Sequence, residues 1–419
     1  MKQIVIEGNN ILTGTIKVSG AKNSAVALIP AAILADDIVT IDNVPNISDI
    51  DALNEILEYL GAKVYREENI MKIDPRGIEN KEIPEVISKK LRASYYFMSA
   101  LLGKFNKVEM YFPGGCSIGA RPIDQTLKGY KALGAEVIEE GNKYMVTAQE
   151  LIGGHVYLDM PSVGATVNTL LAAVKANGET IIENAAKEPE IVNIATFLNN
   201  MGAHIIGAGT SEIRIKGVPH LNGAYTEVIP DRIEAGTYVI AGALVGQNLR
   251  IENIIPDHIE SLTLKLKEMG FKLNIGSDFI EISKSDKLKP VRIKTLGYPG
   301  FPTDLQQPLT TLLTQCDGIS KLEETIYENR FKNVSYLNEM GADIKLIDNR
   351  NIEIHGKSEL IGKEVVATDL RAGACLVLAG LKAQGKTVIK EVEHVLRGYE
   401  NIVEKLTNVG ANITIEEYN

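Results

Sequence analysis

The feature that most constrains this chain is a short phrase that recurs six times along it. The phrase centres on a glycine flanked by apolar residues, as in LGAKV from Leu60 and MGADI from Met340. Its glycines are Gly61, Gly134, Gly202, Gly270, Gly341 and Gly410, spaced 68 to 73 residues apart. Glycine is expected just after the end of a helix, because it enters the left-handed region without steric cost. Six matches at a near-constant interval indicate a structural repeat.

Each repeat contains the same parts in the same order. It begins with a stretch that is apolar nearly all round, such as residues 24–35 or 305–316, and such a helix belongs in a core. A short strand and an amphipathic helix follow. In the first repeat this helix runs from Asp49 to Leu60, with Leu53 and Ile56 on its apolar face. The glycine turn and two short alternating strands close the repeat.

Six such repeats occupy the whole chain of 419 residues and leave no room for a separate type of domain. The sequence therefore predicts an α/β fold of two pseudo-symmetric lobes, each with three buried helices wrapped by sheets. One lobe covers residues 22–229 and the other residues 1–21 plus 230–419, with the boundary near Val228 to Asp231. The strand from Gln3 to Gly8 lacks a partner in its own repeat, so we expect it to pair with the last repeat. A linear solenoid is disfavoured, because solenoid repeats run about 20–45 residues.

Charge and composition exclude several classes of protein. A net charge of −10, no Trp and 5% aromatic residues argue against nucleic-acid binding, which needs basic surfaces and stacking platforms. No apolar run is long enough for a membrane helix, and the N-terminus reads as a strand rather than a signal peptide. Three widely spaced cysteines give neither a disulfide framework nor a paired metal motif, which predicts a cytoplasmic protein. An anionic ligand remains compatible with this composition if cations gather in one place.

Charged or capping residues stand at the entrances of all six buried helices. They are Lys22 with Asn23, Arg92, Ser162, Asp231 with Arg232, Asp304, and Asp369 with Arg371. Helix N-termini attract phosphates and carboxylates, and in pseudo-symmetric lobes these N-termini would converge on the cleft between the lobes. The alternative is that the aspartates are ordinary helix caps. For a lysine or arginine that alternative is weaker, because the helix dipole disfavours a cation there. Two further arginines, Arg330 and Arg397, open amphipathic helices, where a solvated surface arginine is the usual interpretation.

A loop rich in glycine and proline, YFPGGCSIGARPID, runs from Tyr111 to Asp124. It carries Cys116 five residues before Arg121, and an exposed thiol near a cation is ionisable and reactive. We therefore favour a functional role for Cys116 over a structural one. The other two cysteines, Cys316 and Cys375, lie in apolar helical stretches and are predicted to belong to the core.

The phrases SGAKNSA, PGGCSIGARPID, SVGAT, PDRIEAGT, FPTDLQ, YENRF, TDLRAGA and RGYE together resemble those of the UDP-N-acetylglucosamine enolpyruvyl transferases, of the EPSP synthase superfamily. The resemblance covers essentially the whole chain, and that family has two inside-out α/β lobes of three repeats each. It implies transfer of the enolpyruvyl group of phosphoenolpyruvate to the 3-hydroxyl of UDP-N-acetylglucosamine, by addition and elimination with release of phosphate. This is the first committed step of peptidoglycan biosynthesis. The resemblance implies no metal or organic cofactor, and it does not indicate an oligomeric state.

The resemblance also implies roles for individual residues. Cys116 matches a loop cysteine that donates a proton to phosphoenolpyruvate and reacts with fosfomycin, and Asp304 matches the favoured general base. The phosphoenolpyruvate positions are Lys22, Arg121, Arg371 and Arg397. The nucleotide-sugar positions are Asn23, Arg92, Arg121, Pro122, Ile123, Asp124, Gln125, Ser162, Val163, Gly164 and Ile326. The chain departs from many relatives at Gln125 and Thr126, where they have Leu-His, and at Met160, where some have Lys.

Two alternative functions stay open on the sequence. The first is 5-enolpyruvylshikimate-3-phosphate synthase, which shares the fold and the donor; the phrases PGGCSIGARPID and FPTDLQ favour the nucleotide-sugar enzyme over it. The second is a catalytically silent paralogue that binds a nucleotide sugar. The joint presence of Cys116, Arg121, Asp304 and Arg397 argues against such a paralogue.

Overall fold

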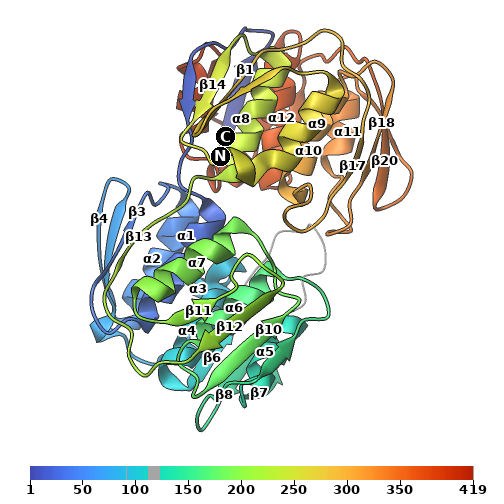
Figure 1. Ribbon diagram of the computed structural model, residues 1–419. Coiled ribbons are helices and arrows are strands. Elements are labelled where there is room, and N and C mark those ends of the chain that lie inside the picture. Colours follow the sequence, from blue (N-terminus) through green and yellow to red (C-terminus); the bar gives the residue numbers. More distant parts are fainter. Residues whose placement is uncertain (91, 112–122, 419) are drawn as a thin grey trace. The chain divides into compact units, whose positions relative to one another are not determined.

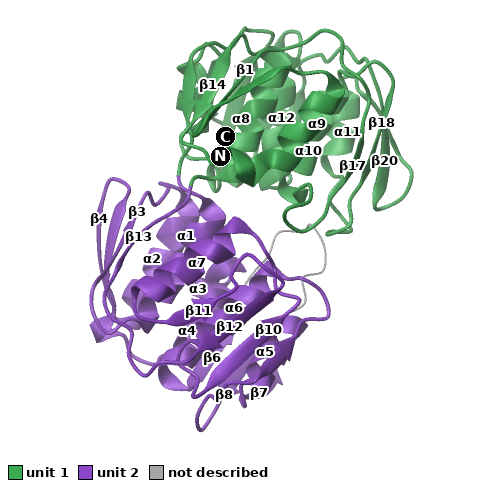
Figure 2. Cartoon of the chain, in the orientation of Figure 1, with its two compact units in different colours: residues 1–19, 117–120, 230–419 green, residues 20–116, 121–229 purple. Residues whose placement is uncertain are grey.

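The computed structural model describes residues 1–90, 92–111 and 123–418, and these residues form two compact units (Figures 1 and 2). Within the described chain, unit 1 comprises residues 1–19 and 230–418, and unit 2 comprises residues 20–111 and 123–229 apart from 91. The chain passes between the units at Ser19–Gly20 and again at Ile229–Pro230. Each unit has its own hydrophobic core.

Each repeat contributes one buried helix to the centre of its unit. In unit 2 these are α1 (Lys22–Ala31), α4 (Tyr96–Phe105) and α6 (Val163–Ala173). In unit 1 they are α8 (Arg232–Val245), α10 (Thr303–Leu313) and α12 (Leu370–Lys382), which pack against one another. Almost every residue of the six is buried, which confirms the prediction of core helices.

One of these helices differs from the prediction, because α10 is buried but not apolar. Gln306, Gln307, Thr310 and Thr311 are all inaccessible to solvent. The two threonines satisfy their hydroxyls locally: Thr310 donates to the carbonyl of Gln306, and Thr311 donates to the carbonyl of Cys375 on α12. Polar side chains of this kind are tolerated in a core when they find hydrogen-bond partners.

The amphipathic helices lie around the buried ones and end at the repeated glycines. They are α2 (Ser48–Leu60), α5 (Asp124–Ala132), α7 (Pro189–Asn200), α9 (Glu260–Met269), α11 (Asn333–Glu339) and α14 (Ile402–Thr407). In α2 the residues Leu53, Ile56, Leu57 and Leu60 are buried, as predicted. The six repeated glycines have φ between 84° and 107°, so each occupies the left-handed region that the glycine turn requires.

Short helical turns complete the list of helices: η1 (Ala32–Leu34), η2 (Pro75–Gly77), α3 (Glu85–Ser88), η3 (Arg92–Tyr95), η4 (Pro256–Ile259) and α13 (Glu393–Leu396).

Each repeat also builds one small sheet on the outside of its unit. The central strands are β3 (Val39–Asp42), β6 (Lys107–Tyr111), β10 (Glu179–Glu183), β14 (Leu249–Glu252), β18 (Ile319–Glu323) and β22 (Lys386–Lys390). Antiparallel hairpins pair with five of them: β4 (Lys63–Glu67) with β5 (Ile70–Asp74), β7 (Glu136–Glu140) with β8 (Lys143–Thr147), β11 (His204–Ile206) with β12 (Glu212–Lys216), β15 (Leu273–Ile275) with β16 (Phe279–Ile282), and β19 (Asp343–Leu346) with β20 (Asn351–His355).

A fourth, parallel strand in five of the sheets comes from a different repeat, which the sequence did not predict. These strands are β2 (Thr15–Lys17), β9 (His155–Tyr157), β13 (Tyr225–Glu227), β17 (Arg292–Lys294) and β21 (Glu364–Val366). In unit 2, β9 pairs with β10 of the following repeat, and β13 of the third repeat returns to β3 of the first. This pairing of strands from different repeats therefore connects the first repeat of unit 2 to its last.

The N-terminal strand completes the last repeat. Strand β1 (Lys2–Glu7) pairs antiparallel with β22 on one side and with β23 (Asn412–Glu417) on the other. The resulting order β21-β22-β1-β23 has the same arrangement as β9-β10-β12-β11 in unit 2. The first strand of the chain thus takes the place of a hairpin strand in the sixth repeat, which confirms the predicted pairing.

Candidate active site

Two predicted site residues, Asp304 and Arg371, belong to a charged cluster at the entrance of α10 in unit 1. Asp304 is in the first turn of this helix, and its side chain is 26% exposed. Its Oδ1 accepts a hydrogen bond from Nη2 of Arg330 at 2.6 Å, and its Oδ2 accepts one from Nη2 of Arg371 at 3.2 Å. Two guanidinium groups therefore hold the carboxylate in one orientation, and such charge-assisted bonds are stronger than neutral ones.

Both arginines are buried and stay charged. Burial opposes the charge on Arg330, but Asp304 and Tyr327 outweigh it and raise the pKa of the Arg330 guanidinium above its ordinary value. For Arg371, burial is likewise outweighed, first by Tyr399 and then by Asp304, so its pKa is also raised. The guanidinium of Arg371 lies 5.2 Å from the centre of the Tyr399 ring. The cluster thus places two permanent cations on one aspartate.

The three aspartates at the helix entrances of unit 1 separate into two kinds. Asp231 caps α8, accepting hydrogen bonds from the backbone of Ile233 and Glu234, and Asp369 caps α12 in the same way. Asp304 makes no cap, because the N-cap residue of α10 is Pro302. The interpretation as a helix cap is therefore right for Asp231 and Asp369. It is wrong for Asp304, whose carboxylate accepts hydrogen bonds from the two arginines instead.

Three polar atoms at this cluster have no hydrogen-bond partner within the described part of the chain. They are Oδ2 of Asp369, Nε of Arg371 and Nε of Arg330, and all three are buried. Buried polar groups are nearly always satisfied in native proteins, so such atoms mark a place where a ligand or solvent is expected to bind. The cluster therefore has the character of a binding site as well as of an ion-pair network.

In unit 2, Lys22 is the first residue of α1 and reaches a carboxylate on the neighbouring helix. Its Nζ lies 2.6 Å from Oδ2 of Asp49, which is buried in the first turn of α2. The lysine side chain itself is 14% exposed, and the next residue, Asn23, is exposed. Asp49 offsets the unfavourable interaction between a cation and the positive end of the helix dipole.

The entrance of α6 carries the predicted nucleotide-sugar residues Ser162, Val163 and Gly164. Ser162 caps the helix by accepting a hydrogen bond from the backbone of Ala165 at 3.2 Å. Gly164 leaves room for a neighbouring tyrosine, because a Cβ at this position would lie 1.9 Å from the hydroxyl oxygen of Tyr95. This helix end therefore presents small, uncharged residues and an N-terminus with partial positive charge, which suits a phosphate group.

Gln125 is buried in the first turn of α5 and connects that helix to the segment before α6. Its Nε2 donates to Asp124 and to Oδ2 of Asp159, at 2.9 and 3.0 Å, and its Oε1 accepts from the backbone of Asp159 at 2.8 Å. Lys128 holds the other oxygen of Asp159 at 2.7 Å. The glutamine that departs from the usual leucine thus fixes the position of the segment that contains Met160.

The remaining predicted residues are placed as follows. Arg92 begins η3 and Arg397 follows α13, both half-buried; Ile123 is buried at the N-cap of α5, with Asp124 exposed beside it. Ile326 is exposed in the segment after β18. Cys116, Arg121 and Pro122 lie outside the described residues. Cys316 and Cys375 are fully buried, and burial raises the pKa of each thiol to about 11, which confirms them as core residues.

Arg330, for which the sequence indicates only a surface position, is brought by the structure to the centre of the cluster. The prediction of a solvated arginine is wrong: only 3% of its side chain is exposed, because Asp304 and Thr303 accept its hydrogen bonds. The only signal in the sequence is its place in the phrase YENRF. The sequence does not reveal Asp49 either, since an aspartate in the first turn of a helix is usually a favourable surface charge.

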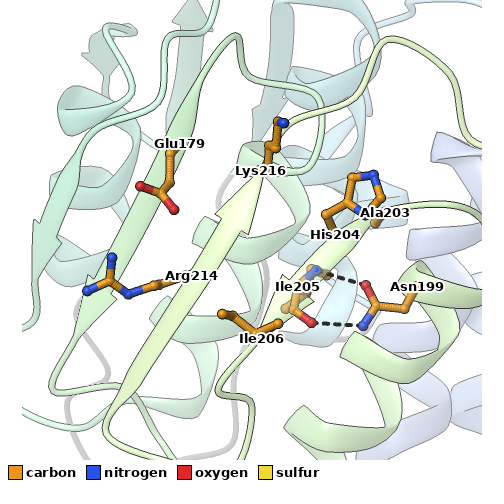
Figure 3. Close-up of a pocket in the computed structure, with 8 residues that line it drawn as sticks. All are labelled: Glu179, Asn199, Ala203, His204, Ile205, Ile206, Arg214 and Lys216. Carbon is orange, nitrogen blue, oxygen red and sulfur yellow. Dashed lines mark hydrogen bonds between the residues drawn. The ribbon is translucent and has the colours of Figure 1, made fainter.

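A separate depression lies on the sheet of β10, β11 and β12 in unit 2 (Figure 3). It has a volume of about 300 Å³, and its lining includes His204 on β11 with Arg214 and Lys216 on β12. Asn199 pairs with both backbone groups of Ile205 at 2.9 Å and so satisfies the exposed edge of the sheet. None of the predicted site residues lines it.

Within the described residues, no group of three or more His, Cys, Asp or Glu side chains is placed to hold a metal ion. In the same part of the chain, no helix is both long enough and apolar enough to cross a membrane.

A comparison with known protein families shows to which family this chain belongs. The family model described as EPSP synthase (3-phosphoshikimate 1-carboxyvinyltransferase) matches residues 6–406. The chain therefore belongs to the EPSP synthase family.

Curated relatives narrow this further. The chain is 53% identical over 412 residues to UDP-N-acetylglucosamine 1-carboxyvinyltransferase 2 of Listeria monocytogenes, covering 98% of this chain and 97% of that protein. It is 54% identical over 418 residues to the protein of the same name in Bacillus cereus, covering 100% of this chain and 97% of the relative.

Solved structures confirm the predicted fold. The crystal structure of the enolpyruvyl transferase NikO from Streptomyces tendae matches with a TM-score of 0.90 at 26% identity, over 100% of this chain and 99% of that one. An EPSP synthase from Acinetobacter baumannii matches over the full length of both chains with a TM-score of 0.76 at 19% identity, which supports the shared fold alone.

Proposed function

We infer that this chain transfers the enolpyruvyl group of phosphoenolpyruvate to the 3-hydroxyl of UDP-N-acetylglucosamine, releasing phosphate in the synthesis of peptidoglycan. The observation that carries this function is an identity of 53–54% with UDP-N-acetylglucosamine 1-carboxyvinyltransferases over 98–100% of the chain. The rival acceptor, shikimate 3-phosphate, is disfavoured because the EPSP synthase structures share only 19–20% of their residues with this chain.

Asp304 is the residue that we propose to accept the proton of the attacking sugar hydroxyl. A general base must lie within hydrogen-bond reach of the proton that it removes, and its carboxylate must be held in a productive orientation. Arg330 and Arg371 supply that orientation by binding one oxygen each. The carboxylate nevertheless keeps 26% of its side-chain surface exposed, so it remains accessible to a substrate.

The donor is a small, multiply charged anion, and we propose that Lys22, Arg121, Arg371 and Arg397 neutralise and orient it. Arg371 is already bonded to Asp304, and its buried Nε has no partner within the described residues. It can therefore bind the donor while holding the base, which would bring the two reacting groups together. Fixed cations of this kind also stabilise the negative charge that develops as phosphate leaves.

We propose that Cys116 donates the proton that the methylene carbon of phosphoenolpyruvate gains on addition. Attack of the sugar oxygen on the adjacent carbon then gives a tetrahedral ketal, and loss of a proton and of phosphate from this ketal restores the double bond. The acceptor would be bound by the entrance of α6, with Ser162, Val163 and Gly164, together with Asn23, Arg92, residues 121–125 and Ile326. The uncharged, capped N-terminus of α6 supports a phosphate ligand at that position.

We also propose that the reaction takes place in the cytoplasm, without a nucleic-acid partner. The buried, unpaired thiols of Cys316 and Cys375 support a reducing compartment.

Phosphate release with two acceptors tests the function directly. The purified chain is incubated with phosphoenolpyruvate and either UDP-N-acetylglucosamine or shikimate 3-phosphate, and free phosphate is measured. We expect release with the nucleotide sugar only. Release with shikimate 3-phosphate only would identify the chain as an EPSP synthase, and release with neither would identify a silent paralogue. The variant Cys116→Ser should lose most turnover and resist covalent inactivation by fosfomycin; unchanged inactivation would refute the role given to Cys116.

A further inference from the structure

Glu324, which follows β18 in unit 1, is a buried carboxylate to which nothing above assigns a role. Its side chain is 0% exposed. Its Oε1 accepts hydrogen bonds from Thr295 Oγ1 at 2.9 Å and from the backbone of Ile326 and Tyr327 at 2.8 and 3.2 Å. Its Oε2 accepts one from Thr303 Oγ1 at 2.8 Å. A buried carboxylate with this many donors fixes the groups around it, because any displacement would leave buried polar groups unsatisfied.

Thr303 connects Glu324 to Arg330, which binds the proposed base. A hydroxyl has one proton, and Thr303 gives it to Glu324, so its oxygen accepts a hydrogen bond from Nη1 of Arg330 at 2.7 Å. The other end of the same guanidinium donates to Asp304 at 2.6 Å. Because a guanidinium is a rigid planar fork, the position of Nη1 also determines that of Nη2.

The charges along this path alternate. Arg330 lies between the carboxylates of Asp304 and Glu324, and both contribute to the raised pKa of its guanidinium against the opposing effect of burial. Arg371 then follows on the far side of Asp304. Buried charges are tolerated when they are paired and hydrogen-bonded in this way, so removal of any one member disturbs the others.

The same carboxylate also fixes a second predicted contact. Through the backbone of Ile326 and Tyr327 it holds the segment that we propose to touch the nucleotide sugar. The ring of Tyr327 in turn lies 5.1 Å from the guanidinium of Arg330. Glu324 therefore connects the proposed base and the segment that we propose to touch the nucleotide sugar.

We propose that Glu324 is a positioning residue for the transfer reaction: it fixes the hydroxyl of Thr303 and thereby the guanidinium that orients Asp304. This inference rests on the proposed role of Asp304 as the general base. Glu324 itself touches neither substrate, so its effect is expected on turnover rather than on donor binding.

The variant Glu324→Gln tests the proposal, because it keeps the shape but replaces an acceptor with an amide donor. Three donors point at the Oε1 position and keep the amide oxygen there, so the NH2 group faces Thr303. The Thr303 hydroxyl could then no longer both give its proton to residue 324 and accept from Arg330. We expect kcat to fall about 10- to 100-fold, the KM for phosphoenolpyruvate to change by less than about twofold, and the pH profile of kcat to shift. The matched control is Glu323→Gln, one residue earlier, where the side chain is partly exposed and pairs with Lys294 at 3.0 Å. The control should leave all three quantities unchanged.

Thr303→Val, which removes the hydroxyl at nearly constant volume, tests the path between Glu324 and Arg330. Residues that act through one another show non-additive effects. The double variant Thr303→Val with Glu324→Gln should therefore lose no more turnover than the worse single variant. Losses that multiply would overturn the proposed path. If Glu324→Gln does not fold, the shift in the pH profile of Thr303→Val decides the question, and an unchanged profile would refute the proposal.

Asp304→Asn separates this inference from the function on which it rests. Normal turnover in that variant would refute the role of Asp304 itself. An inactive Asp304→Asn beside a folded Glu324→Gln with the kcat and pH profile of the unmodified chain would refute only the role of Glu324.

Discussion

In unit 1 the entrances of the buried helices carry Asp231, Asp304 and Asp369, whereas the equivalent entrances in unit 2 carry Lys22, Arg92 and Ser162. The carboxylates of unit 1 bind helix N-termini and buried arginines within the same unit. In unit 2 the two cations are partly exposed, and the end of α6 is capped by a neutral hydroxyl.

The difference suits two kinds of chemistry built on the same repeat. A cluster that neutralises its own charges can hold a carboxylate rigidly, which suits proton transfer to or from a fixed atom. Partly exposed cations and a neutral helix N-terminus favour the binding of an anionic ligand instead. We therefore propose that Asp304 of unit 1 serves the reacting hydroxyl and that residues of unit 2 supply much of the binding of the nucleotide sugar.

The largest expected difference between the units is in the cost of removing one cation. Arg330→Met leaves Asp304 and Glu324 without the charge between them, and breaking a buried ion pair costs about 3–5 kcal/mol. Lys22→Met should cost less, about 1–3 kcal/mol, because it leaves only one carboxylate, that of Asp49, without its partner and the lysine side chain is itself 14% exposed. Urea denaturation of both variants measures the two free energies of unfolding. An equal loss of free energy of unfolding in the two variants would contradict the expected difference between the units.

A pH effect between pH 4.5 and 7 is expected from a buried carboxyl group of unit 1. Burial raises the pKa of Glu234 from 4.5 to about 7, although Lys405 at 2.6 Å opposes this increase. A raised pKa means that the folded chain holds a proton which the unfolded chain has lost, so stability is present below pH 4.5 and is lost as the pH rises toward 7. Across this range the free energy of unfolding should fall by at most about 1.4 kcal/mol per pH unit.

The variant Glu234→Gln should abolish this dependence. Urea denaturation at intervals between pH 5 and 8 would show a falling free energy of unfolding for the unmodified chain and a flatter curve for the variant. Parallel curves would show that Glu234 does not titrate in this range.

In unit 2, Gly164→Ala tests whether the entrance of α6 must stay small. The added methyl group would meet the Tyr95 hydroxyl at 1.9 Å, and forced packing of this kind costs about 1–3 kcal/mol. We expect a higher KM for the nucleotide sugar and a lower free energy of unfolding. Adding Tyr95→Phe to this variant should partly restore the KM and the free energy of unfolding. Without the hydroxyl, the nearest atom to the added Cβ would be the ring carbon Cζ of residue 95, at 3.1 Å. A variant Gly164→Ala that is more stable than the unmodified chain would contradict the close approach, because alanine is otherwise the better helix former.

The smallest effect is expected for Gln125→Leu, which restores the residue that many relatives have. The variant loses three hydrogen bonds, but Lys128 continues to hold Asp159. The KM for the nucleotide sugar should change by about threefold or less, roughly the worth of one neutral hydrogen bond. A large fall in kcat with constant KM would show instead that Gln125 acts on the reacting groups.

The repeat was predictable because its signals are local and recur. Each repeated glycine follows an amphipathic helix, and the pattern of Leu53, Ile56 and Leu57 is visible within one window of sequence. The parallel strands were not predictable, since strands such as β9 and β13 have three residues each and pair with another repeat. Three residues are too few to show an alternating pattern.

Site residues were predictable where a charged residue stands at the entrance of a helix. They were not predictable where only the folded structure buries a charged residue. Asp304 and Arg371 could be selected as charged residues at helix entrances, and the structure brings them to 3.2 Å from each other. Arg330 reads as a surface charge in the segment EETIYENRF, and nothing in that segment singles out Glu324. Both are buried, and the hydroxyl of Thr303 connects them by hydrogen bonds. Such a network depends on three segments that meet only in the folded chain.

The division of labour between the units is tested most directly by the affinity of Asp304→Asn for UDP-N-acetylglucosamine, measured by titration calorimetry beside its turnover. If the residue serves the reacting hydroxyl and unit 2 supplies much of the binding, Kd should stay within about fivefold of the unmodified chain, while kcat falls by about 100-fold or more. A loss of affinity in proportion to the loss of turnover would contradict this assignment and make Asp304 a binding residue.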